Sequence, residues 1–301
     1  MTYQEAVRRA ADQLASAEIE NGQADARFLM EWVSGMSLTS FLLHQIDTMP
    51  QEMEEKYFSL IDQRTAHVPL QHLTGEQEFM GLSFLVNEDV LIPRPETELL
   101  VEETLAWLGS QSPKRAVISL PEDDKEEHHD NRKSSVLDLC TGSGCIAVSL
   151  AHAMPALSVT GVDLSEKALK KAKENAKRNQ ADVTFLQSDL FAELGGRKFD
   201  LIVSNPPYIA SAEIETLMPE VRDHEPRMAL DGTEDGLYFY RRIIKEAKEH
   251  LNSCGALYFE IGYDQGDAVS ELFREHGYQE IIIRKDYAGL DRVARAVWNG
   301  K

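Results

Sequence analysis

Residues 136–151 read VLDLCTGSGCIAVSLA, and this stretch decides the fold class of the 301-residue chain. A short apolar run is followed by a glycine-rich segment and then by apolar residues at helical spacing, which predicts a strand, a tight turn and a helix. Gly142 and Gly144 allow the turn to be tight and allow a ligand to approach the backbone closely. The stretch therefore predicts the nucleoside-binding turn of an α/β protein.

The glycine spacing alone leaves the identity of the nucleoside open. Gly142, Gly144 and Ala147 also fit the G-x-G-x-x-G/A spacing of dinucleotide-binding proteins. Asp138, at the end of the strand before the glycines, is placed to attract the cationic amino-acid end of S-adenosylmethionine, directly or through water. A nicotinamide cofactor, in contrast, gives no role to the motif at residues 205–208 described below. We therefore expect S-adenosylmethionine as the cofactor.

The next two predicted strands are followed by acidic residues that suit a nucleoside. Residues 157–163 (LSVTGVD) end in Asp163, where a carboxylate is expected to bind both ribose hydroxyls. Asp163 can instead belong to the cap of the following helix, but the serine two residues further on can cap that helix without it. Residues 183–187 (VTFLQ) precede Asp189, which can accept a hydrogen bond from the exocyclic amine of adenine. Leu190 either packs on the adenine ring or belongs to the core.

The tetrapeptide NPPY follows another strand, residues 199–204 (FDLIVS), which reads as buried and parallel. Ligands bind beyond the carboxyl ends of such strands, so Asn205 is expected to project its amide into the crevice. Pro206 and Pro207 have a fixed φ and hold the neighbouring carbonyls rigid, while Tyr208 offers a flat face for stacking. The motif is also a common strand terminator and turn, but its position after the nucleoside motif favours a site that methylates an amide or amino nitrogen.

Three strand-end motifs in this order resemble the class I S-adenosylmethionine-dependent methyltransferases. Outside the motifs, four segments resemble the HemK/PrmC family of peptide chain release factor glutamine N5-methyltransferases. NPPY is shared with many amino-methyltransferases, whereas LIPRPETE is far more specific, and the likeness covers nearly the whole chain. The four segments are residues 67–81 (HVPLQHLTGEQEFMG), 91–98 (LIPRPETE), 225–232 (EPRMALDG, with DGL at 235–237) and 285–292 (KDYAGLDR).

The resemblance and the pattern of the chain predict an α/β fold with a seven-stranded, mostly parallel, Rossmann-like sheet of the class I methyltransferase type. Further strands are expected at residues 255–261, 280–283 and 293–298, with helices near 237–250 and 265–275. The last two strands have no helix between them, which suits an antiparallel pair. Six strands are therefore expected to be parallel and the last reversed.

We expect three parts along the chain. Residues 1–75 read as a small N-terminal helical substrate-docking domain, residues 76–90 as a β-hairpin linker that turns at Gly81, and residues 91–301 as the methyltransferase domain. Residues 110–134, which include PEDDKEEHHD, are too polar and too charged to order themselves. We interpret them as a disordered acidic insert, and its two histidines as solvated residues without a metal.

The resemblance implies methyl transfer to the side-chain amide nitrogen of the glutamine in the Gly-Gly-Gln motif of class I peptide chain release factors. This nitrogen is a poor nucleophile because its lone pair is delocalised into the carbonyl. The Asn205 side-chain oxygen and the Pro206 backbone oxygen are expected to accept its two N–H bonds and to stabilise the positive charge that develops during transfer. Tyr208 is expected to stack on the amide plane, and Pro207 completes the substrate-binding residues.

The expected cofactor site combines residues from several strand ends, and no metal is expected in it. Two positions depart from the family pattern. Cys140 stands where a small residue such as glycine is frequent, and Leu190 stands where some relatives carry an aromatic residue. The residues assigned to S-adenosylmethionine are Cys140, Thr141, Gly142, Ser143, Gly144, Asp163, Asp189, Leu190 and Asn205.

Two other functions stay open at this point. A nucleic-acid amino-methyltransferase could present adenine or guanine to the same NPPY site by base flipping, and a non-catalytic module could use the nucleoside pocket as a sensor. The net charge of −20, from 31 basic and 51 acidic residues, argues against nucleic acid, because binding phosphates requires a basic surface. The intact NPPY argues against a sensor.

The remaining features of the chain concern its compartment and partners. No apolar run is long enough to span a membrane, no signal region precedes the first helix, and the three cysteines have neither zinc-site nor C-x-x-C spacing. We expect a soluble, cytoplasmic monomer. Its expected partner is the release factor, with no membrane and no direct nucleic-acid contact.

Overall fold

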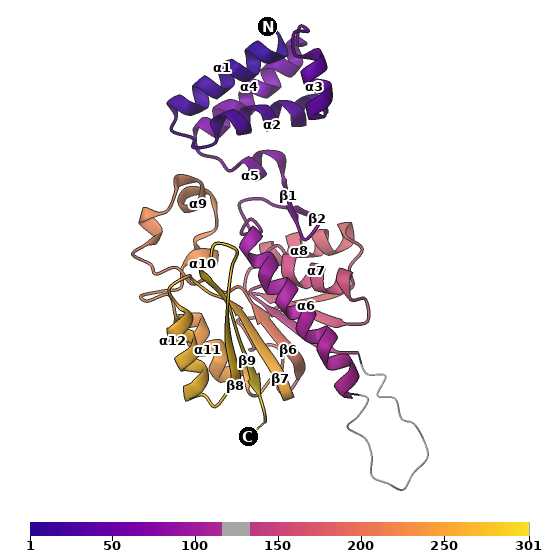
Figure 1. The fold of residues 1–301 in the computed structure, drawn as a ribbon, viewed down its shortest axis with the longest axis vertical. Helices are drawn as coiled ribbons and strands as arrows, with labels where there is room; N and C mark the ends of the chain where they lie inside the picture. The colour runs from indigo at the N-terminus through magenta and orange to yellow at the C-terminus, as the bar shows by residue number, and fades with distance from the viewer. Residues whose placement is uncertain (116–132, 301) are drawn as a thin grey trace. The chain divides into compact units, whose positions relative to one another are not determined.

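The computed structural model describes residues 1–115 and 133–300 (Figure 1). The helix α6 (Pro95–Arg115) extends into the segment that was expected to be an acidic insert, and residues 116–132, with His128 and His129, lie outside the described residues. No helix in the described ranges is long and apolar enough to cross a membrane. The chain divides into two compact units: unit 1 is Met1–Glu76 with Leu217–His224, and unit 2 is Gln77–Thr216 with Glu225–Lys301.

Unit 1 is helical and has its own apolar core. Leu14, Leu29, Tyr57 and Ile61 are fully buried in it, and the Tyr57 hydroxyl donates to the Ala26 carbonyl at 2.9 Å. Three of its helices are a few residues long, too short for an apolar periodicity to be recognised in the sequence. The helices are α1 (Tyr3–Ser16), α2 (Gly22–Ser34), α3 (Leu38–His44), α4 (Gln51–Thr65), α5 (Leu70–Thr74) and α9 (Pro219–His224).

Arg64 holds the distant helix α9 within unit 1. Its Nε donates to Asp25 at 2.8 Å, and its Nη2 donates to Glu220 of α9 at 3.0 Å. The remaining nitrogen donates to the Val68 carbonyl at 3.2 Å. Arg64 and Asp25 are both buried, and buried charges are tolerated when they are paired and hydrogen-bonded. The cluster therefore fixes residues 217–224 to the N-terminal helices.

Unit 2 contains a seven-stranded sheet with the strand order β5-β4-β3-β6-β7-β9-β8. Strands β3 to β7 are parallel to one another, whereas β9 is antiparallel to both of its neighbours, β7 and β8. The predicted arrangement of six parallel strands and one reversed strand is confirmed. The strands are β3 (Ser135–Leu139), β4 (Ser158–Asp163), β5 (Val183–Gln187), β6 (Phe199–Ser204), β7 (Leu251–Glu260), β8 (Gln279–Lys285) and β9 (Asp291–Trp298).

Helices cover both faces of the sheet (Figure 1). Two helices pack on one face, α11 (Tyr238–Ala247) and α12 (Gly266–Glu275). On the other face lie α6, α7 (Cys145–Ala153) and α8 (Glu166–Arg178). The short helices η1 (Ile214–Thr216) and α10 (Arg227–Leu230) lie between β6 and α11 in the chain.

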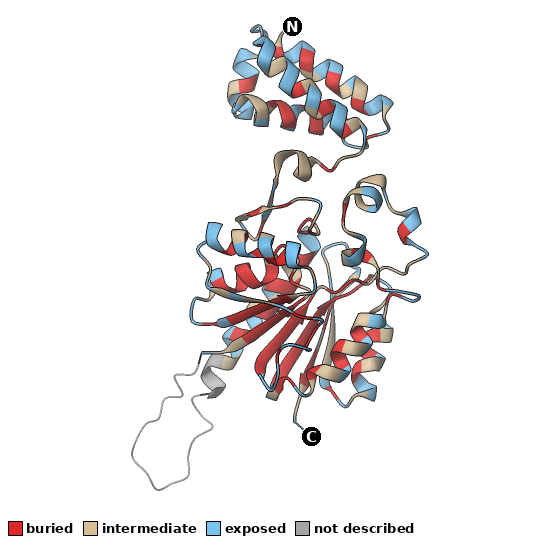
Figure 2. Ribbon diagram, turned by 180° about the vertical axis from the view of Figure 1, so that it is seen from behind, coloured by how far each residue is buried: buried red, intermediate tan, exposed pale blue. Residues whose placement is uncertain are grey.

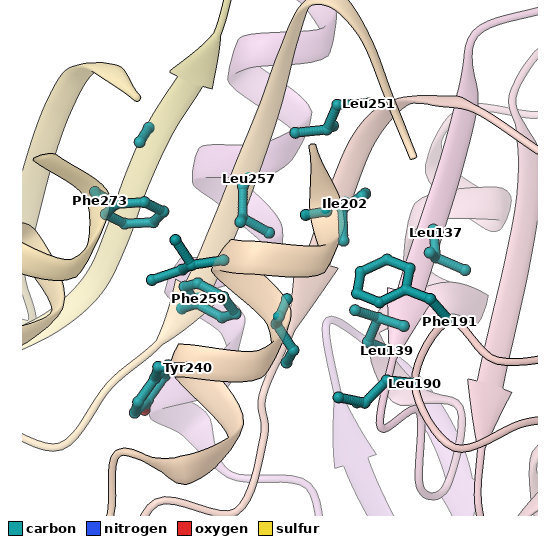
Figure 3. Packing of buried hydrophobic residues seen from close by; sticks show 14 of the residues in the cluster. Leu137, Leu139, Leu190, Phe191, Ile202, Tyr240, Leu251, Leu257, Phe259 and Phe273 are labelled. Carbon is teal, nitrogen blue, oxygen red and sulfur yellow. The ribbon is translucent and has the colours of Figure 1, made fainter. Parts of the chain in front are cut away.

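Successive side chains of each strand enter the two cores alternately. In β6, Leu201 packs on the α6–α7 side and Ile202 on the α11–α12 side. Figure 3 shows the second of these cores, where the rings of Phe259 and Phe273 stack with centroids 5.8 Å apart. The central strands are buried on both faces (Figure 2), which is why their sequences read as continuous apolar runs.

A hairpin precedes the sheet, with β1 (Glu76–Phe79) and β2 (Leu82–Leu85) joined at Met80 and Gly81. Gly81 adopts φ +71°, a left-handed conformation that suits glycine. The Asn175 side chain of α8 accepts from the Leu85 amide at 2.7 Å and donates to the Leu85 carbonyl at 3.1 Å. A side-chain amide thus replaces a neighbouring strand along the edge of β2.

Candidate active site

One cavity opens beyond the carboxyl ends of β3, β4, β5 and β6, the edge at which parallel sheets bind ligands. Segments from which no site residue was predicted also line it: residues 89–91, Pro226 and Met228 of the α10 region, and Phe239 of α11. The predicted site residues that line this cavity are Cys140, Gly142, Asp163, Asp189, Leu190, Asn205 and Pro207.

Asp138 organises the glycine-rich turn from inside the core. Its Oδ2 accepts from the Thr141 hydroxyl at 2.6 Å and from the Ala147 amide at 3.2 Å. The side chain is fully buried, and burial raises the pKa of Asp138 to about 7. Its Oδ1 is buried without a hydrogen-bond partner in the described part of the chain. A buried carboxylate oxygen in this state is poorly stabilised, so a cationic ligand group nearby would stabilise it.

The turn itself uses backbone conformations that favour glycine. Cys140, Gly142 and Gly144 all have positive φ, of +57°, +54° and +81° respectively. A Cβ on Gly144 would lie 3.0 Å from the Cβ of Ala172, so glycine also allows α7 and α8 to approach closely. Cys140 adopts a left-handed conformation that is costly for a residue with a Cβ.

Asp163 is held by backbone amides at the end of β4. Its Oδ2 accepts from the Gly142 amide and its Oδ1 from the Ser165 amide, both at 2.8 Å. Burial raises the pKa of Asp163, and these two hydrogen bonds oppose that shift. Each carboxylate oxygen has further acceptor capacity. Asp163 can therefore accept two more hydrogen bonds from a ligand in the cavity, as a ribose requires.

The end of β5 contributes one polar and one apolar group to the cavity. Asp189 lines the cavity, and its Oδ1 accepts from Arg242 at 2.9 Å, an ion pair that was not anticipated. Leu190 lines the cavity and also packs in the core, with only 5 % of its surface exposed. Both interpretations of Leu190 that the sequence left open are thus compatible with its position.

The NPPY segment leaves β6 and is held by side chains from three other segments. Asn205 Nδ2 donates to the Thr97 hydroxyl of α6 at 3.3 Å. The Tyr208 hydroxyl donates to Oε1 of Glu260, the last residue of β7, also at 3.3 Å. Gln265 Nε2 donates to the Tyr208 carbonyl at 2.9 Å. The Thr97 hydroxyl donates to Glu260 Oε2 at 2.5 Å, which joins these groups into one network.

Some predicted site residues do not line the cavity. They shape the glycine-rich turn and the end of β6, as the hydrogen bonds of Thr141 and Tyr208 show. Thr97 and Glu260 were not assigned to the site from the sequence. Glu260 ends an apolar strand as Asp163 does, and that signal could have identified it. The predicted residues outside the cavity wall are Asp138, Thr141, Ser143, Gly144, Pro206 and Tyr208.

The LIPRPETE and EPRMALDG segments meet in an ion pair. Arg94 donates to Glu225 Oε1 at 2.6 Å, and only 1 % of the Glu225 side chain is exposed. Burial raises the pKa of Glu225, and the charge of Arg94 opposes that shift. The pair fixes the residue before Pro226, which lines the cavity.

Two family models and several relatives match this chain. Residues 5–75 match the PrmC N-terminal domain, and residues 125–221 match the methyltransferase small domain. The release factor glutamine methyltransferase of Geobacter sulfurreducens is 40% identical over 280 residues, covering 93% of this chain and 91% of the relative. The protein of the same name from Moorella thermoacetica is 40% identical, covering 97% of each chain. Among solved structures, the hMettl16 catalytic domain in complex with a 3'UTR hairpin superposes on this chain with a TM-score of 0.53. The match is 15% identical in sequence and covers 83% of this chain and 82% of that one, which shows a shared fold.

Proposed function

The chain belongs to the release factor glutamine methyltransferase family, and we infer that it methylates the side-chain amide nitrogen of the glutamine in the Gly-Gly-Gln motif of class I peptide chain release factors. One observation carries this inference. Asn205 and Pro207 line the same cavity as Gly142 and Asp163. An amide bound beside the first pair and a nucleoside bound beside the second would therefore share one crevice.

S-adenosylmethionine is the proposed cofactor, and two carboxylates suit it. Asp163 lines the cavity and offers two carboxylate oxygens with remaining acceptor capacity for ribose hydroxyls. Asp138 is fully buried and does not line the cavity, so we assign its unpartnered Oδ1 to the cationic amino-acid end through water. When bound, the cofactor supplies an electrophilic methyl group on a sulfonium. Asp189 and Leu190 line the part of the cavity that we assign to adenine.

The residues of the NPPY segment would bind and orient the substrate amide. Its two N–H bonds are accepted by the Asn205 side-chain oxygen and the Pro206 carbonyl, which fixes the direction of the nitrogen lone pair. Both oxygens stabilise the positive charge that develops on nitrogen as the bond to the methyl group forms. Tyr208 is anchored at its hydroxyl by Glu260 and at its carbonyl by Gln265, so its ring is preorganised to stack on the amide.

The helical unit is the proposed docking site for the release factor. Exposed apolar side chains gather on and beside α3, where Leu43 and Ile46 are each 74 % exposed and Leu42 is 53 % exposed. Apolar side chains grouped on a surface often mark a protein-interaction site. We further propose that the protein acts as a cytoplasmic monomer without binding nucleic acid, and the net charge of −20 supports the last point.

Transfer of labelled methyl groups from S-adenosylmethionine tests the proposal. The acceptors are a purified class I release factor, the same factor with Gly-Gly-Gln changed to Gly-Gly-Ala, and bulk tRNA, rRNA and DNA. Label on the intact factor alone is expected. Label on a nucleic acid would replace the substrate with an adenine or guanine amino group, and label on the Gly-Gly-Ala factor would refute the assigned atom.

A further inference from the structure

Glu260 is a buried carboxylate that has no step in the chemistry of methyl transfer. Only 2 % of its surface is exposed, and both of its oxygens accept hydrogen bonds, from Thr97 at 2.5 Å and from Tyr208 at 3.3 Å. Burial raises the pKa of Glu260, and the charge of Arg292 opposes that shift. Arg292 is fixed beside it, because its guanidinium donates to the carbonyl of Ile261 at 3.3 Å. Two hydroxyl donors and the charge of Arg292, which is also paired with Asp286 at 3.1 Å, oppose the upward shift, whereas the charge of Glu96 adds to it.

The direction of each hydrogen bond in this network follows from the chemistry of the groups. The Thr97 hydroxyl donates its single proton to Oε2 of Glu260. The Thr97 oxygen then acts as an acceptor toward Asn205, 3.3 Å away. The atom of Asn205 at this position must be its NH2 group, because only that group can donate. The side-chain oxygen of Asn205 is left over, and no donor in the described part of the chain reaches it.

We propose that Glu260 and Thr97 are positioning residues that hold the Asn205 amide with its oxygen available to the cavity, where it accepts an N–H of the substrate amide. The inference rests on the proposed function and adds to it the reason why the site takes a nitrogen that carries hydrogens. Two hydrogen bonds separate Glu260 from Asn205 through Thr97, and Glu260 also accepts from the Tyr208 hydroxyl, so the carboxylate acts on the substrate only through these two side chains.

The orientation of the Asn205 amide has to be fixed by a hydrogen bond, because the two ends of an asparagine amide have nearly the same shape. A flipped Asn205 would present its NH2 group to the NH2 group of the substrate, which brings two donors face to face and leaves the Pro206 carbonyl as the one remaining acceptor assigned to the developing positive charge. Packing around the amide distinguishes the two orientations only weakly. The proton of Thr97 distinguishes them strongly, because it is committed to Glu260.

Three variants in the full-length enzyme test the inference. Thr97→Val keeps the shape of the side chain but removes the hydroxyl. Thr97→Ser restores the hydroxyl. Thr104→Val is the matched control, because Thr104 is also buried in α6 but its hydroxyl donates to the Leu100 carbonyl of its own helix. The readouts are kcat and KM for release-factor methylation, the calorimetric affinity for S-adenosylmethionine, and the melting temperature.

Thr97→Val is expected to lower kcat/KM for the release factor about 10- to 100-fold, the effect of losing one buried hydrogen bond that orients a catalytic group. Cofactor affinity should be unchanged, Thr97→Ser should recover most of the rate, and Thr104→Val should retain the wild-type rate. Glu260→Gln, which places a donor in the network, should lower the rate as Thr97→Val does.

A wild-type rate in Thr97→Val would overturn the inference, as would a Thr97→Ser enzyme that is as slow as Thr97→Val. A loss of cofactor affinity that accounts for the whole effect would also overturn it. Failure of the proposed function is distinguishable, since the wild-type enzyme itself would then leave the release factor unlabelled.

Discussion

Replacing Asp138 with asparagine is expected to change the stability of the ligand-free protein in a pH-dependent way. Burial raises the pKa of Asp138 from its ordinary value of 3.8 to about 7. The folded protein therefore binds this proton more tightly than the unfolded chain does. The free energy of unfolding falls as the pH rises from 3.8 toward 7, and the whole cost of ionising the buried group is present above that range.

The size of the effect follows from the shift. Ionisation of the buried Asp138 lowers the free energy of unfolding by about 4 kcal/mol at pH 8. At pH 5, where the folded protein still keeps the proton, the loss is less than about 2 kcal/mol. Asparagine removes this cost, and its oxygen can still accept from Thr141 and Ala147, as Oδ2 of Asp138 does. Its NH2 group takes the position of the unpartnered Oδ1, which costs about 1–3 kcal/mol for a buried donor. Asp138→Asn should therefore stabilise the protein by about 1–3 kcal/mol at pH 8 and by little or nothing at pH 5.

Urea unfolding of the wild-type and Asp138→Asn proteins at both pH values measures this difference, and calorimetry measures the affinity for S-adenosylmethionine. We expect the stabilised variant to bind the cofactor more weakly, because the carboxylate that costs stability is the one assigned to its cationic end. The reasoning would be refuted if the difference in unfolding free energy between variant and wild type were the same at both pH values, because ionisation of Asp138 would then contribute nothing.

Three further substitutions probe other parts of the structure. Arg64→Met leaves the buried Asp25 without its cation and should destabilise the protein by about 3–5 kcal/mol in urea unfolding, whereas a loss below about 1 kcal/mol would show that the pair is solvated. Gly144→Ala forces a Cβ to within 3.0 Å of Ala172 at a φ of +81° and should lower the melting temperature, with an unchanged temperature contradicting the close packing. Asp163→Ala should weaken cofactor binding about 10-fold or more, as the loss of hydrogen bonds to a charged acceptor predicts, and undiminished affinity in calorimetry would remove the ribose assignment.

The number of strands, their directions and most of their positions could be predicted because buried parallel strands are apolar runs that end in polar residues. The exception is β7, which was expected from Gly255 but begins at Leu251. Residues 252–254 (NSC) interrupt the apolar pattern between these two positions, and the pairing register between β6 and β7 shifts in the same region. Periodicity cannot reveal a strand across such an irregularity.

The site residues that could be predicted are those that directly follow the carboxyl end of a strand. Gly142, Asp163 and Asn205 were placed at one edge by the rule that parallel strands share their carboxyl ends, and they line one cavity. Thr97 and Glu260 could not be connected to Asn205 in this way, because their contacts span 108 and 163 residues of sequence. Only the folded structure brings α6, β6 and β7 together at this point.

The assignment of catalysis to Asn205 is tested most directly by comparing release-factor methylation and cofactor affinity in the wild-type and Asn205→Ala enzymes. Removing the acceptor that stabilises the developing charge should lower kcat by about 100-fold or more, the effect of deleting one such group elsewhere. Binding of S-adenosylmethionine should be largely retained, because Asp163 and the glycine-rich turn are intact. Turnover at the wild-type rate in Asn205→Ala would contradict the account.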